Sequence, residues 1–278
     1  MNVKDINNFL QTKNFAASKK MGQNFLINNN IKKRIVDSAN IQPKEVVLEI
    51  GPGAGAITSI LLTHKIKLIA FELDKRLADL LSQKFASYNN FNLFNVDALK
   101  MDWDEKIKHF SDKPIKLVAN LPYSISSLLI LKILKSNYVN EAVIMVQKEM
   151  AERLVAKTST HSYNAFSALI QLFFKTQKLF DVDRNNFSPK PKVCSSVIKI
   201  TKIDNIDSNS IENIQKIDAF LKCAFNNKRK TLVNNLSAKY DKNKIINVLE
   251  KQSLSLTVRA EEIKPINLLQ IMETLDNA

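Results

Sequence analysis

The stretch Glu45–Gly55, EVVLEIGPGAG, decides the fold of this chain. Its first six residues have the length and hydrophobicity of a strand buried in a parallel sheet. Its remainder holds three of the chain's four glycines, and an apolar helical pattern, Ile57–Leu62, follows. Glycines between a strand and a helix let a ligand approach the backbone and face the helix N-terminus. The stretch predicts an α/β fold with a ligand at this loop, although Gly51, Gly53 and Ala56 also match the pattern of dinucleotide-binding sites.

The second predicted strand, Lys67–Phe71, is followed by two acidic residues, Glu72 and Asp74. A carboxylate at this position of an α/β sheet accepts hydrogen bonds from the hydroxyls of a ribose. An acidic residue directly before a helix instead caps its N-terminus. We assign the ribose to Glu72 and the cap of the helix Lys75–Phe85 to Asp74.

The third and fourth predicted strands also end in polar groups. Asp97 follows Phe91–Val96, where it either accepts from the amine of a bound adenine or forms a turn. Asn120-Leu121-Pro122-Tyr123 follows Ile115–Ala119 and offers an amide, a backbone fixed by proline and a flat ring. Such a tetrapeptide alone is more often an ordinary turn. Ligands of α/β sheets bind outside the carboxyl ends of the strands, so we expect these groups to share one crevice.

A stiff, basic loop, Phe187–Lys192, separates two further predicted strands, Leu179–Val182 and Val193–Ile200. Its aromatic residue and its two lysines could stack and neutralise a nucleotide. In the alternative interpretation the loop is an ordinary connection with Phe187 packed inward. The sequence around this loop favours neither.

The two ends of the chain have different patterns. Residues 1–18 are polar with isolated apolar side chains and predict a short helix or a loosely held arm. Ile203–Ser210 is the best candidate for a linker, and apolar residues recur at helical spacing beyond it. The basic run Lys228–Lys230 is either a phosphate clamp or a partner of a helix dipole. We therefore expect two domains, residues 1–203 and residues 211–278.

The composition predicts a polyanionic partner. The chain has 41 Lys and Arg against 27 Asp and Glu, a net charge of +14, and excess basic residues favour binding to nucleic acid. A Lys-, Asn- and Ile-rich composition of an AT-rich genome would give the same bias. Cys194 and Cys223 and the three scattered histidines indicate neither a disulfide framework nor a metal site. The absence of an apolar span or of a signal-peptide pattern predicts a cytoplasmic protein that does not enter a membrane.

Seven short motifs are distributed along nearly the whole chain. In order they are Gly22-Gln23-Asn24-Phe25-Leu26, Glu49-Ile50-Gly51-Pro52-Gly53, Ala119–Tyr123, Gln147-Lys148-Glu149, Phe187–Val193, Lys228-Arg229-Lys230-Thr231-Leu232 and Arg259-Ala260-Glu261. In this order and spacing the chain resembles the class I S-adenosylmethionine methyltransferases, and within them the ribosomal RNA adenine N6-dimethyltransferases of the KsgA/RsmA type. It is less similar to the antibiotic-resistance dimethyltransferases of large-subunit RNA, which tend to have Gly-Ser-Gly where this chain has Gly51-Pro52-Gly53.

The resemblance implies a Rossmann-like, seven-stranded and mostly parallel sheet whose last strand inserts antiparallel, with a small all-helical RNA-binding domain. It implies S-adenosyl-L-methionine as methyl donor, and no metal. The expected cofactor-binding residues are Asn24, Leu26, Gly51, Gly53, Glu72, Asp97 and Asn120. The expected catalytic residues are Asn120, Leu121, Pro122, Tyr123 and Phe187.

Each catalytic residue has an expected role. The Asn120 side-chain oxygen and the Leu121 carbonyl would accept hydrogen bonds from N6 of an unstacked adenine, and Pro122 would keep the carbonyl aimed. Tyr123 and Phe187 would hold the base between two flat surfaces. The methylated amine can lose its proton to solvent, so no strong general base is expected.

The expected substrate is a pair of adjacent adenosines in the 3′-terminal hairpin of 16S rRNA, modified by a monomeric enzyme that contributes to biogenesis of the small ribosomal subunit. Two alternatives remain. A non-enzymatic RNA-binding assembly or transcription factor could use the same fold, although the intact motifs argue against it. The glycine pattern also permits a nucleotide-dependent oxidoreductase, which the net charge and the Asn120–Tyr123 motif do not favour.

Overall fold

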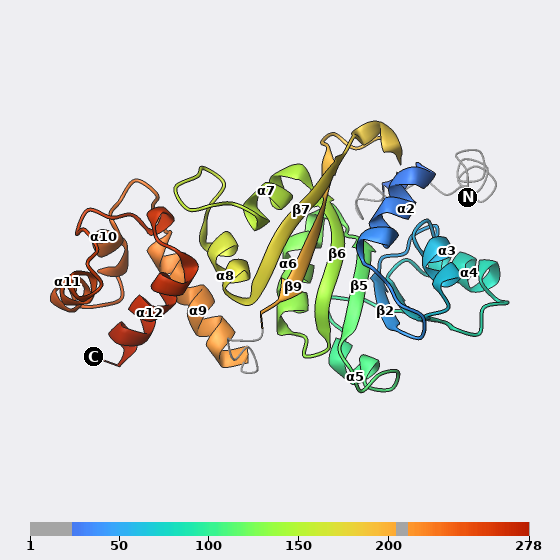
Figure 1. Cartoon of the computed structure of the whole chain (residues 1–278), viewed down its shortest axis with the longest axis horizontal. Helices are drawn as coiled ribbons and strands as arrows, with labels where there is room; N and C mark the ends of the chain where they lie inside the picture. Colours follow the sequence, from blue (N-terminus) through green and yellow to red (C-terminus); the bar gives the residue numbers. More distant parts are fainter. Residues whose placement is uncertain (1–23, 204–210, 278) are drawn as a thin grey trace. The chain divides into compact units, whose positions relative to one another are not determined.

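The computed structural model describes residues 24–203 and 211–277 (Figure 1). The expectations for the N-terminal arm and for most of the linker lie outside these residues. The chain divides into two compact units. The first consists of the chain up to Ala151 and Gln177–Thr201, and the second of Glu152–Thr176 and the chain from Lys202.

The main sheet of the described chain has seven strands in the order β4-β3-β2-β5-β6-β9-β7. Their bounds are β2 Val46–Ile50, β3 Lys67–Glu72, β4 Phe91–Asn95, β5 Ile115–Asn120, β6 Val139–Gln147, β7 Phe174–Val182 and β9 Ser195–Lys202. The neighbouring strands from β4 to β6 all pair parallel. Strand β9 lies between β6 and β7 and runs antiparallel to β6. Figure 1 shows β2, β5 and β6 side by side in the middle of the sheet. The predicted fold class is therefore confirmed, including the inserted antiparallel strand.

One strand is longer than its sequence pattern indicates. The strand predicted over Leu179–Val182 is β7, which begins at Phe174, directly after the helix α8, Ala165–Phe173. The first half of β7 is mostly polar and exposed, because β7 lies at the edge of the sheet. An edge strand does not need the continuous apolar run by which buried strands are recognised.

Several helices of the first unit begin at a polar side chain that caps them. Asn28 accepts hydrogen bonds from the backbone at the start of α2, and Asp74 does so at the start of α4. Trp103 is buried at the start of α5, as expected of a packing residue. The helices are α2 Asn29–Ser38, α3 Thr58–Leu61, α4 Lys75–Lys84, α5 Trp103–Ile107, α6 Ser126–Lys135 and α7 Lys148–Leu154, of which the end of α7 belongs to the second unit.

A second, two-stranded sheet joins distant parts of the chain. Its strands are β1, Phe25–Leu26, and β8, Phe187–Ser188, which pair antiparallel. The Ile27 amide extends the ladder by donating to the Asn186 carbonyl at 2.8 Å. The segment before α2 is thereby fixed beside the strands of the main sheet.

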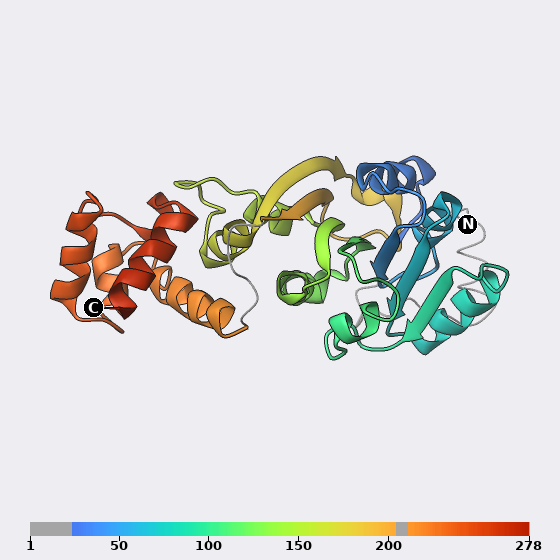
Figure 2. The same ribbon diagram turned by 60° about the horizontal axis from the view of Figure 1, so that its bottom comes forward.

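The second unit is helical, and its helices pack on one another (Figure 2). They are α8 and, in chain order, α9 Ile211–Ala224, α10 Leu232–Leu236, α11 Lys242–Lys251 and α12 Pro265–Asp276. The helix α8 packs against α9 and α12, which places it with the C-terminal helices even though it precedes β7 and β9 in sequence. The compact units thus differ from a simple division of the chain at residues 203–211.

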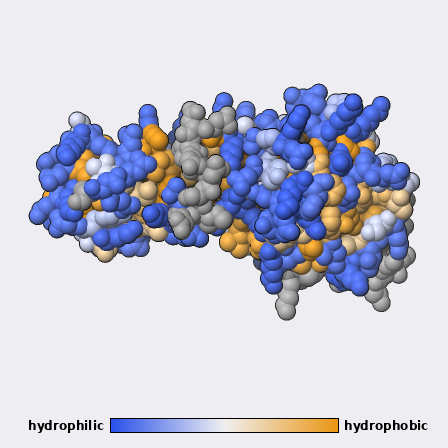
Figure 3. Space-filling model, turned by 90° about the horizontal axis from the view of Figure 1, so that it is seen from below, coloured by the Kyte–Doolittle hydropathy of each residue, from blue (hydrophilic) through white to orange (hydrophobic). Residues whose placement is uncertain are grey.

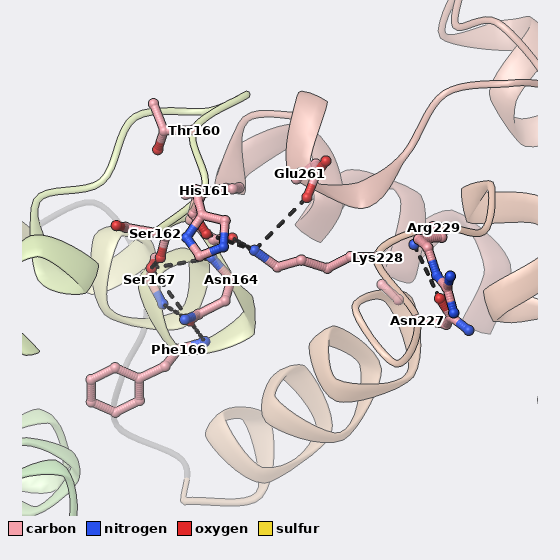
Figure 4. A network of polar contacts seen from close by, with 12 residues as sticks. Thr160, His161, Ser162, Asn164, Phe166, Ser167, Asn227, Lys228, Arg229 and Glu261 are labelled. Carbon is pink, nitrogen blue, oxygen red and sulfur yellow. Dashed lines mark hydrogen bonds and ion pairs between the residues drawn. The ribbon is translucent and has the colours of Figure 1, made fainter. Parts of the chain in front are cut away.

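Lys228 joins two parts of the second unit through backbone carbonyls (Figure 4). Its ammonium group donates to the carbonyls of His161 and Tyr163 at 2.8 and 2.9 Å, and Glu261 lies 3.9 Å away. Lys228 therefore holds the segment before α8 against the C-terminal part of the unit. Lys228 and its neighbours Arg229 and Lys230 are all exposed, so Lys228 makes this contact at the surface of the unit.

Hydrophilic residues cover most of the face drawn in Figure 3, with apolar residues in smaller patches. In residues 24–203 and 211–277, no helix has the length and apolar character needed to cross a membrane.

Candidate active site

A pocket opens at the carboxyl ends of β2, β3, β4 and β5 in the first unit. It is lined by the glycine loop, by the ends of those strands and by the segment of β1. All but one of the residues predicted for the site line this single pocket, namely Asn24, Leu26, Gly51, Gly53, Glu72, Asp97, Asn120, Leu121, Pro122 and Tyr123. The exception is Phe187.

The glycine loop has a backbone that residues with side chains rarely adopt. Gly53 has φ +60°, and a Cβ atom there would lie 3.3 Å from the Phe25 ring. Gly55 has φ +76°, and a Cβ atom there would lie 2.8 Å from the Phe85 ring. Positive φ costs a residue with a Cβ about 1–2 kcal/mol, before any clash. Glycine is required at these two positions because an aromatic side chain packs closely against the backbone at each of them.

Glu72 connects the second strand to the glycine loop. Its carboxylate accepts from the Gly53 amide at 3.0 Å and from the Asp74 amide at 2.9 Å. Burial raises the pKa of Glu72, and these backbone hydrogen bonds oppose that shift. An ionised carboxylate has about four acceptor positions, so two bonds to the backbone leave capacity for hydroxyl groups of a ligand.

A second carboxyl group, Glu49, lines the same pocket, and the sequence interpretation missed it as a functional residue. Its side chain is 2% exposed and accepts from the Thr58 hydroxyl at 2.7 Å. Burial raises the pKa of Glu49 to about 8, so the group is mainly protonated at neutral pH. An acidic residue inside the apolar run VVLEI was the signal that could have identified it.

Asn120 presents an unused acceptor at the end of β5. Its amide nitrogen lies 3.4 Å from the Asn24 carbonyl, to which it donates. Its side-chain oxygen is buried and has no hydrogen-bond partner among the residues that the structure describes. Because a buried polar atom without a partner costs about 1–3 kcal/mol, this oxygen is a site for a donor from a ligand.

The backbone after Asn120 is fixed by its surroundings. The Leu121 amide donates to the Met145 carbonyl at 3.1 Å, which extends the pairing of β5 with β6. Pro122 lies against Gly51, where an added Cβ atom would be 3.7 Å from the proline ring. Tyr123 begins a short 3-10 helix, and its hydroxyl lies 2.6 Å from the Ser195 hydroxyl. The motif is held before any ligand arrives.

Asp97 forms the turn that its sequence position allowed and also lies at the pocket. Its carboxylate accepts from the Leu99 amide at 2.9 Å, as a turn-forming aspartate does. The residue also lines the pocket. The turn therefore holds Asp97 beside the ligand space.

Phe187 is not placed as the stacking role requires. Its side chain is 3% exposed, and it packs in an apolar cluster with Leu26, Val36 and Val182 among others. The pairing of β8 with β1 orients Phe187 opposite Leu26. The inward-packed alternative describes this structure, and Tyr123 is the aromatic side chain of the predicted pair that lines the pocket.

The chain is similar to known proteins over most of its length. A family model described as ribosomal RNA adenine dimethylase matches residues 14–277. The chain is 47% identical over 280 residues to ribosomal RNA small subunit methyltransferase A of Ureaplasma parvum serovar 3, covering 99% of this chain and 100% of the relative.

Two solved structures are also similar. A dimethyladenosine transferase from Plasmodium falciparum is 28% identical, with a TM-score of 0.77 and coverage of 91% of this chain and 98% of that chain. The 23S rRNA methyltransferase ErmE is 23% identical, with a TM-score of 0.70 and coverage of 91% and 100%, and supports the fold alone.

Proposed function

Because the chain belongs to the ribosomal RNA adenine dimethylase family, we propose that it dimethylates N6 of two adjacent adenosines in the 3′-terminal hairpin of 16S rRNA. The chain is an rRNA adenine dimethyltransferase that uses S-adenosyl-L-methionine. The observation that supports the site assignment is the unpartnered Asn120 oxygen, in the same pocket as Tyr123 and the glycine loop.

The pocket fits the methyl donor. The glycine loop, with Asn24 and Leu26, would surround its methionine part. Glu72 would accept from the ribose hydroxyls, and Asp97 would lie near the adenine. The chemistry that the donor supplies when bound is a methyl group on a positively charged sulfur.

The residues of the Asn120–Tyr123 motif would prepare the nucleophile. The lone pair of N6 is delocalised into the purine ring, which makes the amine a weak nucleophile. The Asn120 oxygen and the Leu121 carbonyl would each accept a hydrogen bond from the amine. These two bonds would direct the lone pair of N6 toward the methyl group. The Tyr123 ring would stack on the target base.

Proton transfer in this site does not require Tyr123. Burial raises the pKa of its phenol, so the side chain is neutral at physiological pH and is not a base. With the methyl donor bound, N6 of the adenine would form its new bond to the methyl carbon, and the carbon–sulfur bond would break with its electron pair going to sulfur. The methylated amine then carries a positive charge, and its proton leaves to solvent.

We propose that the partner of this protein is RNA of the small ribosomal subunit. The net charge of +14 favours a polyanion, and exposed Arg229 and Lys230 give the helical unit two cations for phosphate. We assign substrate recognition to this unit and methyl transfer to the first. We further propose a monomeric enzyme that works in the cytoplasm during ribosome biogenesis.

Labelled S-adenosylmethionine and undermethylated small subunits test this function. The wild-type protein should label two adjacent adenosines near the 3′ end of the RNA, as mass spectrometry of RNA fragments can show. Asn120→Ala should lose transfer while its affinity for RNA stays within about twofold. Asn92→Ala, the same substitution on β4 outside the pocket lining, should retain transfer. Binding of RNA without transfer by the wild-type protein would refute the enzymatic proposal.

A further inference from the structure

Two adjacent serines begin β9, and both are completely buried. Ser195 and Ser196 are each 0% exposed. Successive side chains of a strand point to opposite faces of the sheet. The Ser195 hydroxyl meets the Tyr123 hydroxyl at 2.6 Å, whereas the Ser196 hydroxyl donates to the Asp181 carboxylate, also at 2.6 Å. The pair offers two similar hydrogen bonds, only one of which reaches a residue of the pocket.

The backbone at Ser195 is rigid. Ser195 pairs with Gln147 at the end of β6, and the Lys148 amide donates to the Cys194 carbonyl at 3.0 Å. Because the serine side chain is short, the Ser195 hydroxyl stays close to this hydrogen-bonded backbone.

Tyr123 is held at both of its ends. At the backbone, its carbonyl accepts from the Ser126 hydroxyl at 3.2 Å, at the start of α6. At the far end of the side chain, its hydroxyl meets Ser195. The hydroxyl oxygen lies on the long axis of the ring, so two fixed ends hold that axis in place and leave the ring only rotation about it. A ring with a fixed axis has less orientational freedom to lose when it receives a flat base.

We propose that Ser195 is a positioning residue for methyl transfer, which acts by holding the long axis of the Tyr123 ring where the ring stacks on the target adenine. The inference rests on the proposed role of Tyr123 at the base. Ser195 is outside the pocket lining and need not touch substrate or cofactor. Its effect should therefore appear in the rate of transfer, while affinity for S-adenosylmethionine stays unchanged.

A double-mutant cycle tests the inference. Ser195→Ala and Tyr123→Phe remove the same hydrogen bond from its two sides and leave the aromatic ring in place. Each should lower kcat on undermethylated small subunits by about two- to tenfold, the range for one hydrogen bond of about 0.5–1.5 kcal/mol. The double variant should be no slower than the slower single variant, because the bond can be lost only once. The dissociation constant for S-adenosylmethionine should stay within about twofold in all three.

Ser196→Ala is the matched control. It removes an equally buried hydroxyl and an equally short hydrogen bond from the neighbouring position. It should lower the melting temperature while kcat remains that of the wild type. If Ser195→Ala does not fold, Tyr123→Phe reports on the same bond from the other side.

Three results would overturn the inference. The first is a wild-type kcat in both Ser195→Ala and Tyr123→Phe. The second is a double variant whose fold-loss of kcat is the product of the two single fold-losses. The third is a loss of kcat in Ser196→Ala equal to that in Ser195→Ala. If the wild-type protein transfers no methyl group to RNA, the proposed function fails, and this inference fails with it. Wild-type transfer with an unaffected Ser195→Ala overturns the inference alone.

Discussion

The buried carboxyl group of Glu49 should make the stability of this protein depend on pH, and Glu49→Gln should remove that dependence. Burial raises the pKa of Glu49 from 4.5 to about 8 in the folded chain. The unfolded chain has the ordinary value. Glutamine has nearly the same shape, its side-chain oxygen can accept from Thr58 as the carboxyl does, and it does not titrate.

The sign of the effect follows from the number of bound protons. Between the unfolded and folded pKa values of Glu49, 4.5 and about 8, the folded chain holds a proton that the unfolded chain has lost. The free energy of unfolding therefore falls as pH rises through this interval, by about 1.4 kcal/mol per pH unit. The stabilising contribution is complete below the lower pKa and is lost above the higher one. From about pH 6 to about pH 7.5 the loss amounts to about 2 kcal/mol.

Thermal denaturation at several pH values measures this difference. For domains of this size, 1 kcal/mol corresponds to about 2–4 °C in melting temperature. Over this pH range the wild-type protein should lose about 4–8 °C more than Glu49→Gln does. Because both proteins share every other titrating group, the difference between their curves isolates Glu49. Parallel curves would show that Glu49 is ionised in the folded protein, contrary to our reasoning.

Three further substitutions test other contacts. Glu72→Gln should weaken S-adenosylmethionine binding by about tenfold or more in equilibrium dialysis, because an amide donor would replace one of two acceptor oxygens; unchanged affinity would refute the ribose assignment. Gly55→Ala should lower the free energy of unfolding by about 2 kcal/mol in urea denaturation, through positive φ and contact with Phe85, and an unchanged midpoint would contradict that strain. Lys228→Met should lower the melting temperature, since two carbonyls lose their donor, while its neighbour Arg229→Met should not. Equal melting temperatures for Lys228→Met and wild type would show that the contact is not stabilising.

The strands and caps near the site could be predicted because their signals are local. The apolar run before Gly51 and the acidic residues after each strand placed the pocket at the correct edge of the sheet. The cap at Asp74 followed from the preference of a helix N-terminus for a side-chain acceptor. Each of these features depends on a few neighbouring residues, which the sequence presents directly.

Features that depend on tertiary contacts could not be predicted in this way. Strands β1 and β8 have two residues each, too few for any periodicity, and each exists because the other is beside it. The inward packing of Phe187 depends on that pairing. The polar start of β7 and the packing of α8 with the C-terminal helices likewise require partners that lie elsewhere in the chain.

The pairing of β1 with β8 also has a consequence for protein synthesis. Asn28 next to β1 and Asn186 next to β8 are 158 residues apart and share a hydrogen bond of 2.8 Å. A chain is made from its N-terminus, and parts of it fold as they emerge. The segment of Asn24–Leu26, which closes one side of the pocket, can take this position only after β8 has left the translating ribosome. A nascent chain that stops before β8 should therefore hold the methyl donor more weakly than the finished protein, although its glycine loop is already present.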